Sequence, residues 1–147
     1  MMHLEHLNLV VTDIDASLAF YQAAFPHWRV RQQGQSSWSN KPRRWLHFGD
    51  DYQYLTFNDN GAGENRDLAG HQPGLGHFAF VTSNIEELVE RLAQAGFTVA
   101  KDGADEVYRK NVYFIDPAGF EVEFVEYLSD IPAQRNHSHK IEQETAA

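Results

Sequence analysis

Two segments of the chain, 71 positions apart, repeat one pattern of residues. Residues 6–15 read His-Leu-Asn-Leu-Val-Val-Thr-Asp-Ile-Asp, and residues 77–86 read His-Phe-Ala-Phe-Val-Thr-Ser-Asn-Ile-Glu. Each segment opens with alternating apolar residues, which is typical of a strand with one buried face. Each then passes through an N-cap signal, Thr12-Asp13 or Ser83-Asn84, into a helical pattern. Because self-similarity at a fixed offset marks repeated units, the chain is predicted to contain two similar modules.

Both modules continue in the same way after their first strand. In the first, about residues 3–58, we expect a helix near 14–25 and strands near 28–33, 45–49 and 52–58. In the second, about residues 76–128, we expect a helix near 85–95 and strands near 97–101, 107–115 and 120–127. Residues 59–75 form a polar, Gly-rich linker, and residues 129–147 form a polar C-terminal tail. We therefore predict one α+β domain over residues 1–128, built from two tandem βαβββ modules with curved mixed sheets.

The composition excludes several classes of function. The chain has 147 residues, 42% of them hydrophobic, which is enough for a core without disulfides. Its formal net charge of −9 repels phosphate backbones, so we expect no nucleic-acid partner. The absence of cysteine removes thiolate metal sites and cysteine nucleophiles. No apolar run is long enough to cross a bilayer, and the first residues show no secretory signal. We therefore expect a cytoplasmic protein with no membrane partner.

Alternation along the strands separates two faces. The apolar face carries Leu7, Leu9, Leu46, Phe48, Leu55, Phe57, Phe78, Phe80, Val122 and Phe124. The opposite face carries His6, Asn8, Trp45, His47, Tyr52, Tyr54, His77, Tyr113, Glu121 and Glu123. If both helices cover the apolar face, the second face is a concave, aromatic-walled surface of the kind that binds small molecules.

Three motifs, in this order, resemble one protein family. They are the opening strand and helix from His6 to Tyr21, the run Gly76-His77-Phe78-Ala79-Phe80, and the run Asp116-Pro117-Ala118-Gly119-Phe120-Glu121-Val122-Glu123-Phe124. Together they resemble the vicinal-oxygen-chelate superfamily of glyoxalases, bleomycin-resistance proteins and extradiol dioxygenases. The resemblance covers about residues 4–127.

The resemblance implies a metal site at His6, His77 and Glu123. Two imidazoles and one carboxylate match the facial-triad pattern, which leaves coordination positions open. Open positions let a metal polarise a substrate oxygen or activate water. The ligand types do not choose among Zn, Ni, Fe, Mn and Co, so we expect a divalent metal ion of undetermined identity. The alternative is that all three are hydrogen-bonded polar residues of a sheet.

Departures from the subfamily patterns narrow the activity. Glyoxalase I relatives have a second glutamate where this chain has Tyr54, and an arginine where it has Val10. Fosfomycin-modifying relatives have a cationic residue shortly after the last ligand, whereas no positive charge follows Glu123 before Arg135. We therefore expect neither glutathione-dependent glyoxalase I chemistry nor fosfomycin transfer.

Other residues of the polar face have candidate roles. Tyr113 stands ten positions before Glu123, as an active-site tyrosine does in extradiol dioxygenases, although a rim aromatic fits as well. His47 fits a general base, a fourth ligand or a hydrogen-bonded structural histidine. Glu121 fits a base, a partner of a ligand histidine or a solvated rim residue. The predicted substrate-binding residues are Tyr54, Trp45, Tyr52 and Asn8.

The segment from residue 36 to residue 44 is predicted as a loop. Its basic run, Lys41-Pro42-Arg43-Arg44, fits a solvated patch or a contact for an anionic substrate group. Trp38, in the same segment, fits a flexible lid.

These features favour a metal-dependent enzyme that holds a small oxygen-rich molecule by bidentate chelation, with lyase, isomerase or dioxygenase chemistry. The alternative is a non-catalytic binder of a drug or metabolite, as among the bleomycin-resistance relatives. The resemblance also implies a homodimer, in which a site is built either within one chain or from His6 of one chain with His77 and Glu123 of the other. Open sheet edges and an exposed concave surface are a physical reason to pair.

Overall fold

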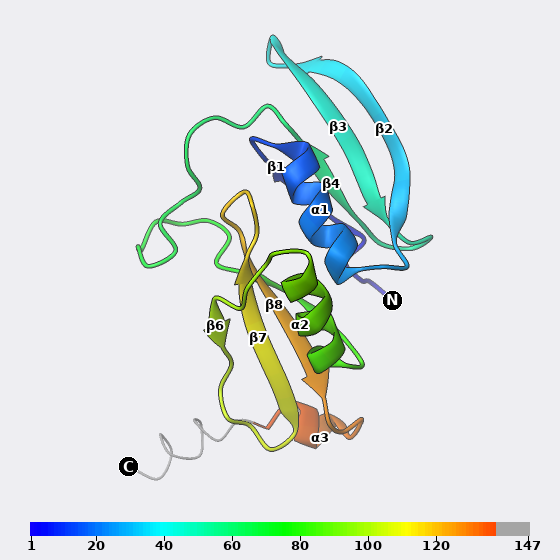
Figure 1. Cartoon of the computed structure of the whole chain (residues 1–147), viewed down its shortest axis with the longest axis vertical. Coiled ribbons are helices and arrows are strands. Elements are labelled where there is room, and N and C mark those ends of the chain that lie inside the picture. The colour runs from blue at the N-terminus through cyan, green and yellow to red at the C-terminus, as the bar shows by residue number, and fades with distance from the viewer. Residues whose placement is uncertain (138–147) are drawn as a thin grey trace. The chain divides into compact units, whose positions relative to one another are not determined.

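The first module is a mixed four-stranded sheet with one helix. A computed structural model of the protein describes residues 1–137 (Figure 1). The strands run in the order β1-β4-β3-β2. They are β1 (His6–Val10), β2 (Arg29–Trp38), β3 (Lys41–Gly49) and β4 (Tyr54–Asn58), and helix α1 (Ile14–Ala24) packs on β3 and β4. β1 pairs parallel to β4, whereas the other neighbours are antiparallel.

The second module repeats this architecture in the order β5-β8-β7-β6. Its elements are β5 (Phe78–Val81), α2 (Ile85–Gln94), β6 (Lys101–Asp102), β7 (Arg109–Ile115) and β8 (Glu121–Tyr127). β5 pairs parallel to β8, and α2 packs on β8. The α+β fold of two βαβββ modules is therefore confirmed.

One strand of the second module and one segment of the tail differ from the prediction. The strand expected near residues 97–101 is the two-residue edge strand β6, because only Lys101 and Asp102 find ladder partners, on β7. Within the predicted tail, Pro132–Arg135 form one helical turn, α3, which starts with proline at its first position. Residues 138–147 of that tail lie outside the described part of the chain.

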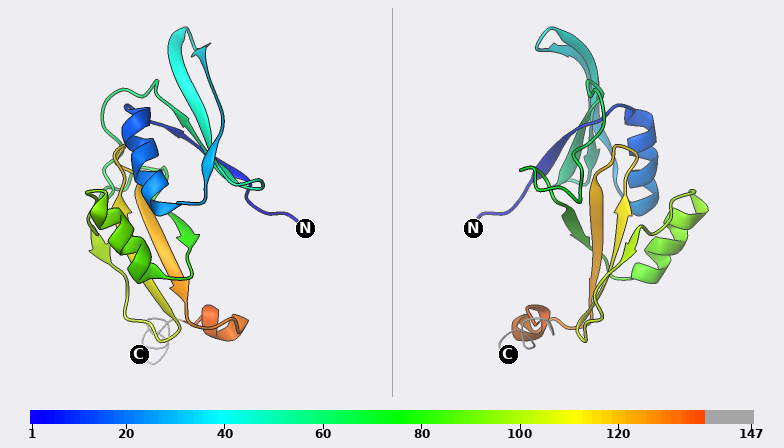
Figure 2. Two further views of the ribbon diagram at one scale, coloured as in Figure 1. Left: turned by 45° about the vertical axis from the view of Figure 1, so that its right-hand side comes forward. Right: turned by 90° about the vertical axis from the view of Figure 1, so that its left-hand side faces the viewer.

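The loop predicted for residues 36–44 is wrong, because β2 and β3 continue through it as one long hairpin. The chain reverses at Ser39 and Asn40, whose φ angles are 49° and 62°. Two successive positive φ values match the type I′ turn, whose twist suits paired strands. Figure 2 shows this hairpin as a curved arm of its sheet. Trp38 therefore ends a strand, with the Arg43 guanidinium 4.9 Å from its ring, and is not part of a loop lid.

The predicted apolar faces form the two cores. In the first module, Leu46, Phe48, Leu55 and Phe57 are at most 2% exposed and lie on the sheet face that α1 covers. In the second module, Phe114, Val122 and Phe124 are likewise at most 2% exposed. So are Leu88 and Leu92 of α2. The opposite faces therefore remain for polar chemistry, as the alternation predicts.

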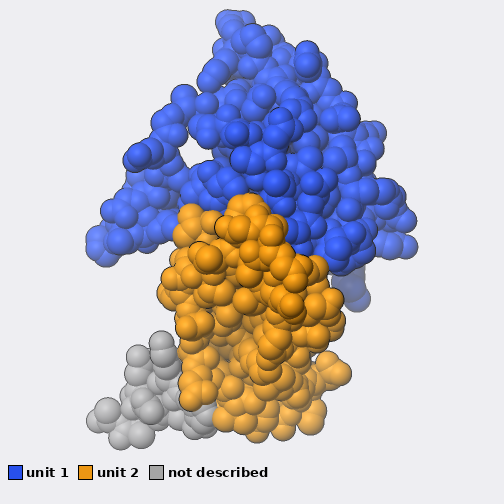
Figure 3. All heavy atoms as spheres, viewed as in Figure 1, with its two compact units in different colours: residues 1–74, 116–120 blue, residues 75–115, 121–147 orange. Residues whose placement is uncertain are grey.

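The chain divides into two compact units (Figure 3). The first comprises residues 1–74 with 116–120, and the second comprises residues 75–115 with the chain from Glu121 onward. The turn 116–120 belongs to the first unit because it forms hydrogen bonds with residues of that unit. The Tyr21 hydroxyl donates to Asp116 at 2.7 Å, and the Asn65 amide donates to the Ala118 carbonyl at 3.1 Å.

Candidate functional site

Two of the three predicted metal ligands lie together in the second unit. Nε2 of His77 is 3.2 Å from Oε2 of Glu123, and Nδ1 of His77 is 3.7 Å from Oε1 of Glu121. The His77 side chain is 46% exposed, whereas those of Glu123 and Glu121 are 13% and 17% exposed. A half-exposed imidazole beside shielded carboxylates offers nitrogen and oxygen donors on an open surface, which suits a divalent metal.

Asn111 orients Glu123 and was not singled out from the sequence. Its Nδ2 donates to Oε1 of Glu123 at 2.7 Å and to the Tyr113 hydroxyl at 3.2 Å. The Asn111 amide packs against Gly103, where a Cβ would meet Oδ1 at 1.7 Å. A fixed amide holds the carboxylate so that Oε2 remains turned to His77. Strand alternation with Tyr113, two positions away, is the sequence signal that points to this residue.

Tyr113 is the cross-strand neighbour of Glu123 and lies beside His77, with ring centroids 5.6 Å apart. Partial burial raises the pKa of the Tyr113 hydroxyl, and the Glu123 carboxylate raises it further. The hydroxyl therefore keeps its proton at neutral pH and acts as a hydrogen-bond donor. Nζ of Lys101 lies 4.1 Å from the centre of the Tyr113 ring. The same ammonium lies 3.5 Å from Oε2 of Glu121, so Glu121 has a cationic neighbour.

His6, the third predicted ligand, belongs to the first unit. Its ring stacks on Tyr54, with centroids 4.8 Å apart, and its Nδ1 lies 3.0 Å from Glu5. Within residues 1–137, no three His, Asp or Glu side chains form a group that could hold a metal ion. Within the second unit, His77 and Glu123 form a two-donor half-site, and these two residues fit a metal as part of a larger set.

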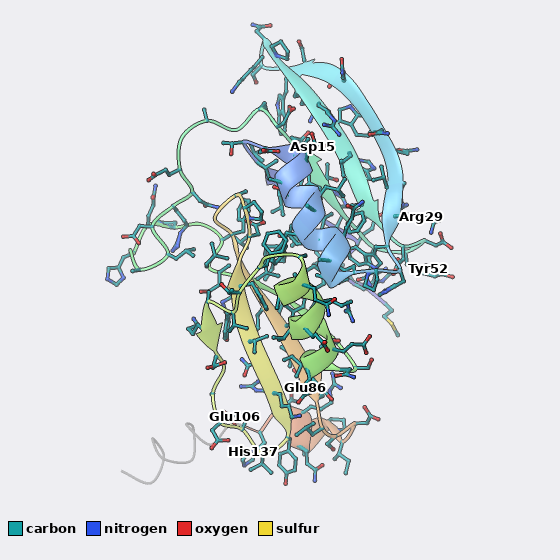
Figure 4. All side chains as sticks on the ribbon, in the orientation of Figure 1. Asp15, Arg29, Tyr52, Glu86, Glu106 and His137 are labelled. Carbon is teal, nitrogen blue, oxygen red and sulfur yellow. The ribbon has the colours of Figure 1, made fainter. Side chains whose placement is uncertain are left out.

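A pocket of about 280 Å³ lies on the polar face of the first sheet. Its lining comprises His6, Asn8, Arg43, Trp45, His47, Tyr54, Thr56 and Asn58. Three of the four predicted substrate-binding residues therefore share one pocket. The fourth, Tyr52, is outside it: it is 83% exposed on the turn before β4 (Figure 4), because β4 begins only at Tyr54.

His47 lines this pocket between Tyr54 and Trp45. Its ring lies 4.8 Å from that of Tyr54 and 5.1 Å from that of Trp45. Partial burial lowers the pKa of His47, and the charges of Arg31 and His6 lower it further. The imidazole is therefore unprotonated at neutral pH and able to accept a proton, which is compatible with the base that the sequence suggested.

Arg43 and Asn58 complete the pocket and were missed as site residues. The Arg43 guanidinium donates to Oδ1 of Asn58 and, through Nε, to the Ser36 hydroxyl at 3.0 Å. Asn58 is fully buried and donates to Oδ1 of Asn8 at 2.6 Å. Arg43 alternates with Trp45 and His47, so a correct strand prediction would have placed it on this face.

The comparisons with known proteins agree with this architecture. The profile of the Glyoxalase/Bleomycin resistance protein/Dioxygenase superfamily matches residues 3–124, and the chain belongs to that superfamily. No curated protein matches the chain. Among the described residues, no helix is long and apolar enough to cross a membrane.

Solved structures share the fold at low sequence identity. A glyoxylase/bleomycin resistance protein/dioxygenase domain from Frankia sp. EAN1pec is 20% identical, with a TM-score of 0.70 over 93% of this chain and 99% of that one. A glyoxalase family protein from Bacillus cereus is 12% identical, with a TM-score of 0.71 over 88% and 96%. A variant of the fosfomycin resistance protein FosX from Listeria monocytogenes, with Mn(II) and 1S,2S-dihydroxypropylphosphonic acid, is 17% identical, with a TM-score of 0.68 over 92% and 99%.

Proposed function

We propose that the protein is a metal-dependent enzyme that holds a small oxygen-rich molecule through two of its oxygens. The observation that carries this proposal is the pair His77 and Glu123, 3.2 Å apart on an open face, with Asn111 fixing the carboxylate. The Mn(II) in the FosX structure supports a divalent ion in this superfamily. His6 is the proposed third ligand, supplied by a second copy of the chain in a homodimer.

The bound metal would act as a Lewis acid on the chelating oxygens. Around it, the chain's own groups have separate roles. Tyr113 donates a hydrogen bond to a substrate oxygen, since its raised pKa keeps the hydroxyl protonated. His47 of the copy that supplies His6 accepts a proton from the substrate, since its lowered pKa keeps the ring neutral. The aromatic rings of Trp45 and Tyr54 of that same copy hold the organic part of the molecule. These roles are compatible with lyase, isomerase or dioxygenase chemistry.

A second candidate function is metal-free binding of a drug or metabolite. The observation that favours it is that the aromatic pocket is present in a single unit. In this case His77 and Glu123 are an ordinary histidine–carboxylate pair.

Metal titration separates the two functions. Protein freed of metal with a chelator is titrated with Mn²⁺ and Ni²⁺ in a calorimeter. We expect one ion per chain, and an affinity at least about tenfold lower in His77→Ala and in Glu123→Gln, because each loses a donor. His27→Ala and Glu90→Gln, two exposed positions outside the half-site, serve as matched controls and should keep the affinity. Equal affinity in all five proteins would favour the metal-free binder.

A further inference from the structure

The pocket on the first sheet has a charge opposite to that of the chain. The whole sequence has a net charge of −9, yet the pocket lining contains the guanidinium of Arg43, which is always cationic, and no carboxylate. A concave surface of one sign focuses its field and attracts small ions of the other sign. The pocket therefore favours an anionic ligand in an acidic protein.

Arg43 is held in a fixed position without a carboxylate partner. Asn58, Ser36 and the Trp38 ring hold its guanidinium from different sides. In the described part of the chain, no Asp or Glu lies within ion-pair distance of Arg43, and its Nη2 donates to no protein group. A rigid guanidinium with unused N–H groups fits the two oxygens of a carboxylate or phosphonate.

The neighbouring arginine shows what an ordinary surface arginine does here. Arg44 lies on the other face of β3 and donates to the Asp15 carboxylate at 2.8 Å. Arg29 and Arg91 are likewise paired with carboxylates. Arg43 therefore differs from these arginines, and from Arg44 on the same strand, in having no carboxylate partner.

The walls of the pocket are flat rings in contact. His6, Tyr54, His47 and Trp45 form a continuous row, with successive centroids 4.8, 4.8 and 5.1 Å apart. The Trp45 indole lies over Gly34, where a Cβ would meet Cζ2 at 2.9 Å. Because Gly34 has no side chain, the indole lies against β2 and leaves the pocket open. This row of rings gives the pocket an aromatic wall, which suits the apolar part of an organic ligand.

A β-bulge brings a second arginine to the same row. The pairing of β2 with β3 shifts between Val30 and Gln32, so Arg31 is the extra residue. Bulges re-aim a side chain relative to the strand. The Arg31 guanidinium lies 4.5 Å from the Tyr54 ring.

We propose that this pocket binds a small aromatic oxyanion, with its carboxylate or phosphonate on Arg43 and its ring against the aromatic wall that includes Trp45. That such a molecule is the substrate rests on the proposed function. Binding itself requires no metal.

Matched neutral and charged probes test the proposal on metal-free protein. Binding of 4-hydroxybenzoate, phenylphosphonate and the uncharged 4-hydroxybenzamide is measured at low ionic strength by calorimetry and tryptophan fluorescence. We expect at least one oxyanion to bind about tenfold or more tightly than the amide, and Arg43→Gln to abolish this preference. Arg44→Gln, which removes the same charge from the other face of the strand, should retain it. The carboxylate and phosphonate arms tell which oxyanion the pocket prefers.

A second variant keeps the test valid if Arg43→Gln does not fold. Asn8→Asp preserves the oxygen that accepts from Asn58 and adds a negative charge to the pocket. We expect it to weaken oxyanion binding and leave amide binding unchanged. Equal binding of oxyanions and amide by the wild type, no detectable oxyanion binding, or equal losses in Arg43→Gln and Arg44→Gln would each overturn the proposal. Because no metal is present, this test and the metal titration can fail separately.

Discussion

Asp116 is a buried carboxyl group that holds the turn 116–120 together. Its Oδ1 accepts from the backbone N–H groups of Ala118 and Phe120, both at 2.9 Å, and its Oδ2 accepts from the Tyr21 hydroxyl. Gly119 completes the turn with a φ of 82°, which an L side chain rarely adopts. The sequence signal Asp-Pro-Ala-Gly thus predicts the turn, but not the long-range bond to Tyr21 on α1.

The ionisation of Asp116 links this turn to pH. Burial raises the pKa of Asp116 above its ordinary value of 3.8, although the Tyr21 hydroxyl and the backbone N–H groups oppose the change. A carboxyl whose pKa is raised on folding adds stability below its unfolded pKa and loses that contribution as pH rises through its folded pKa. We therefore expect the stability of the wild type relative to Asp116→Asn to fall as pH rises from about 4 towards neutrality. Urea unfolding of both proteins across this range measures the difference, and a pH-independent difference would contradict it.

At the scale of the element, local signals decide where the helices begin. The Asp13 carboxylate accepts from the N–H groups of Asp15 and Ala16, and Asn84 accepts from the N–H of Glu87. These caps satisfy N–H groups that the helix itself leaves unpaired. Both were predicted because the signal lies within three residues of the donors.

Removal of the first cap should destabilise the protein measurably. We expect Asp13→Ala to lower the free energy of unfolding by about 1 kcal/mol, because the first turn of α1 loses its acceptor. Asp15→Ala is the matched control: it removes an exposed carboxylate of the same turn (Figure 4) that pairs with Arg44 and caps nothing. Chemical denaturation should show the larger loss for Asp13→Ala. Equal losses would mean that charge at the helix start, and not the cap, is what matters.

The β2–β3 hairpin shows where local signals are insufficient. Ser39-Asn40 lacks the glycine that usually marks a two-residue turn, and the flanking strands carry basic and polar residues. The two strands are stabilised instead by their pairing with each other. This pairing runs from Trp38 opposite Lys41 to Arg29 opposite Gly49. Arg43 was therefore interpreted as part of a solvated patch, although the possibility of an anionic contact was raised for the same run.

At the scale of the whole molecule, the proposed homodimer makes a distinct prediction. His6 belongs to one compact unit, and His77 with Glu123 to the other. If each metal site combines units from two chains, a mixed dimer of His6→Ala and Glu123→Gln contains one site with all three ligands and one without His6 or Glu123. If each site is built within a chain, the mixed dimer contains no complete site.

Co-expression of the two variants with different tags that bind no metal yields the mixed dimer. We expect about half of the wild-type metal content in it and almost none in either variant alone, measured after removal of loosely bound ions. Light scattering at micromolar concentration checks that the proteins are dimers. A monomer, or a mixed dimer without metal, would contradict a site shared between chains.

Sequence alone determined the repeat, the two βαβββ modules, the helix starts and the division into apolar and polar faces. Each of these depends on neighbours within a few positions, through the period of two in strands and the spacing of caps. The same alternation placed His6, Asn8, Trp45, His47 and Tyr54 on one face, where they now share a pocket.

Only the tertiary structure decided which polar side chains contact one another. His77 meets Glu123 because β5 pairs parallel to β8 in one register, and Asn111 reaches the same carboxylate from β7. Arg43 becomes a pocket residue because the hairpin extends to Ser39-Asn40 and the buried Asn58 accepts from it. Strand register and hydrogen bonds between distant residues follow from the packing of the whole sheet, which the pattern within a single strand does not specify.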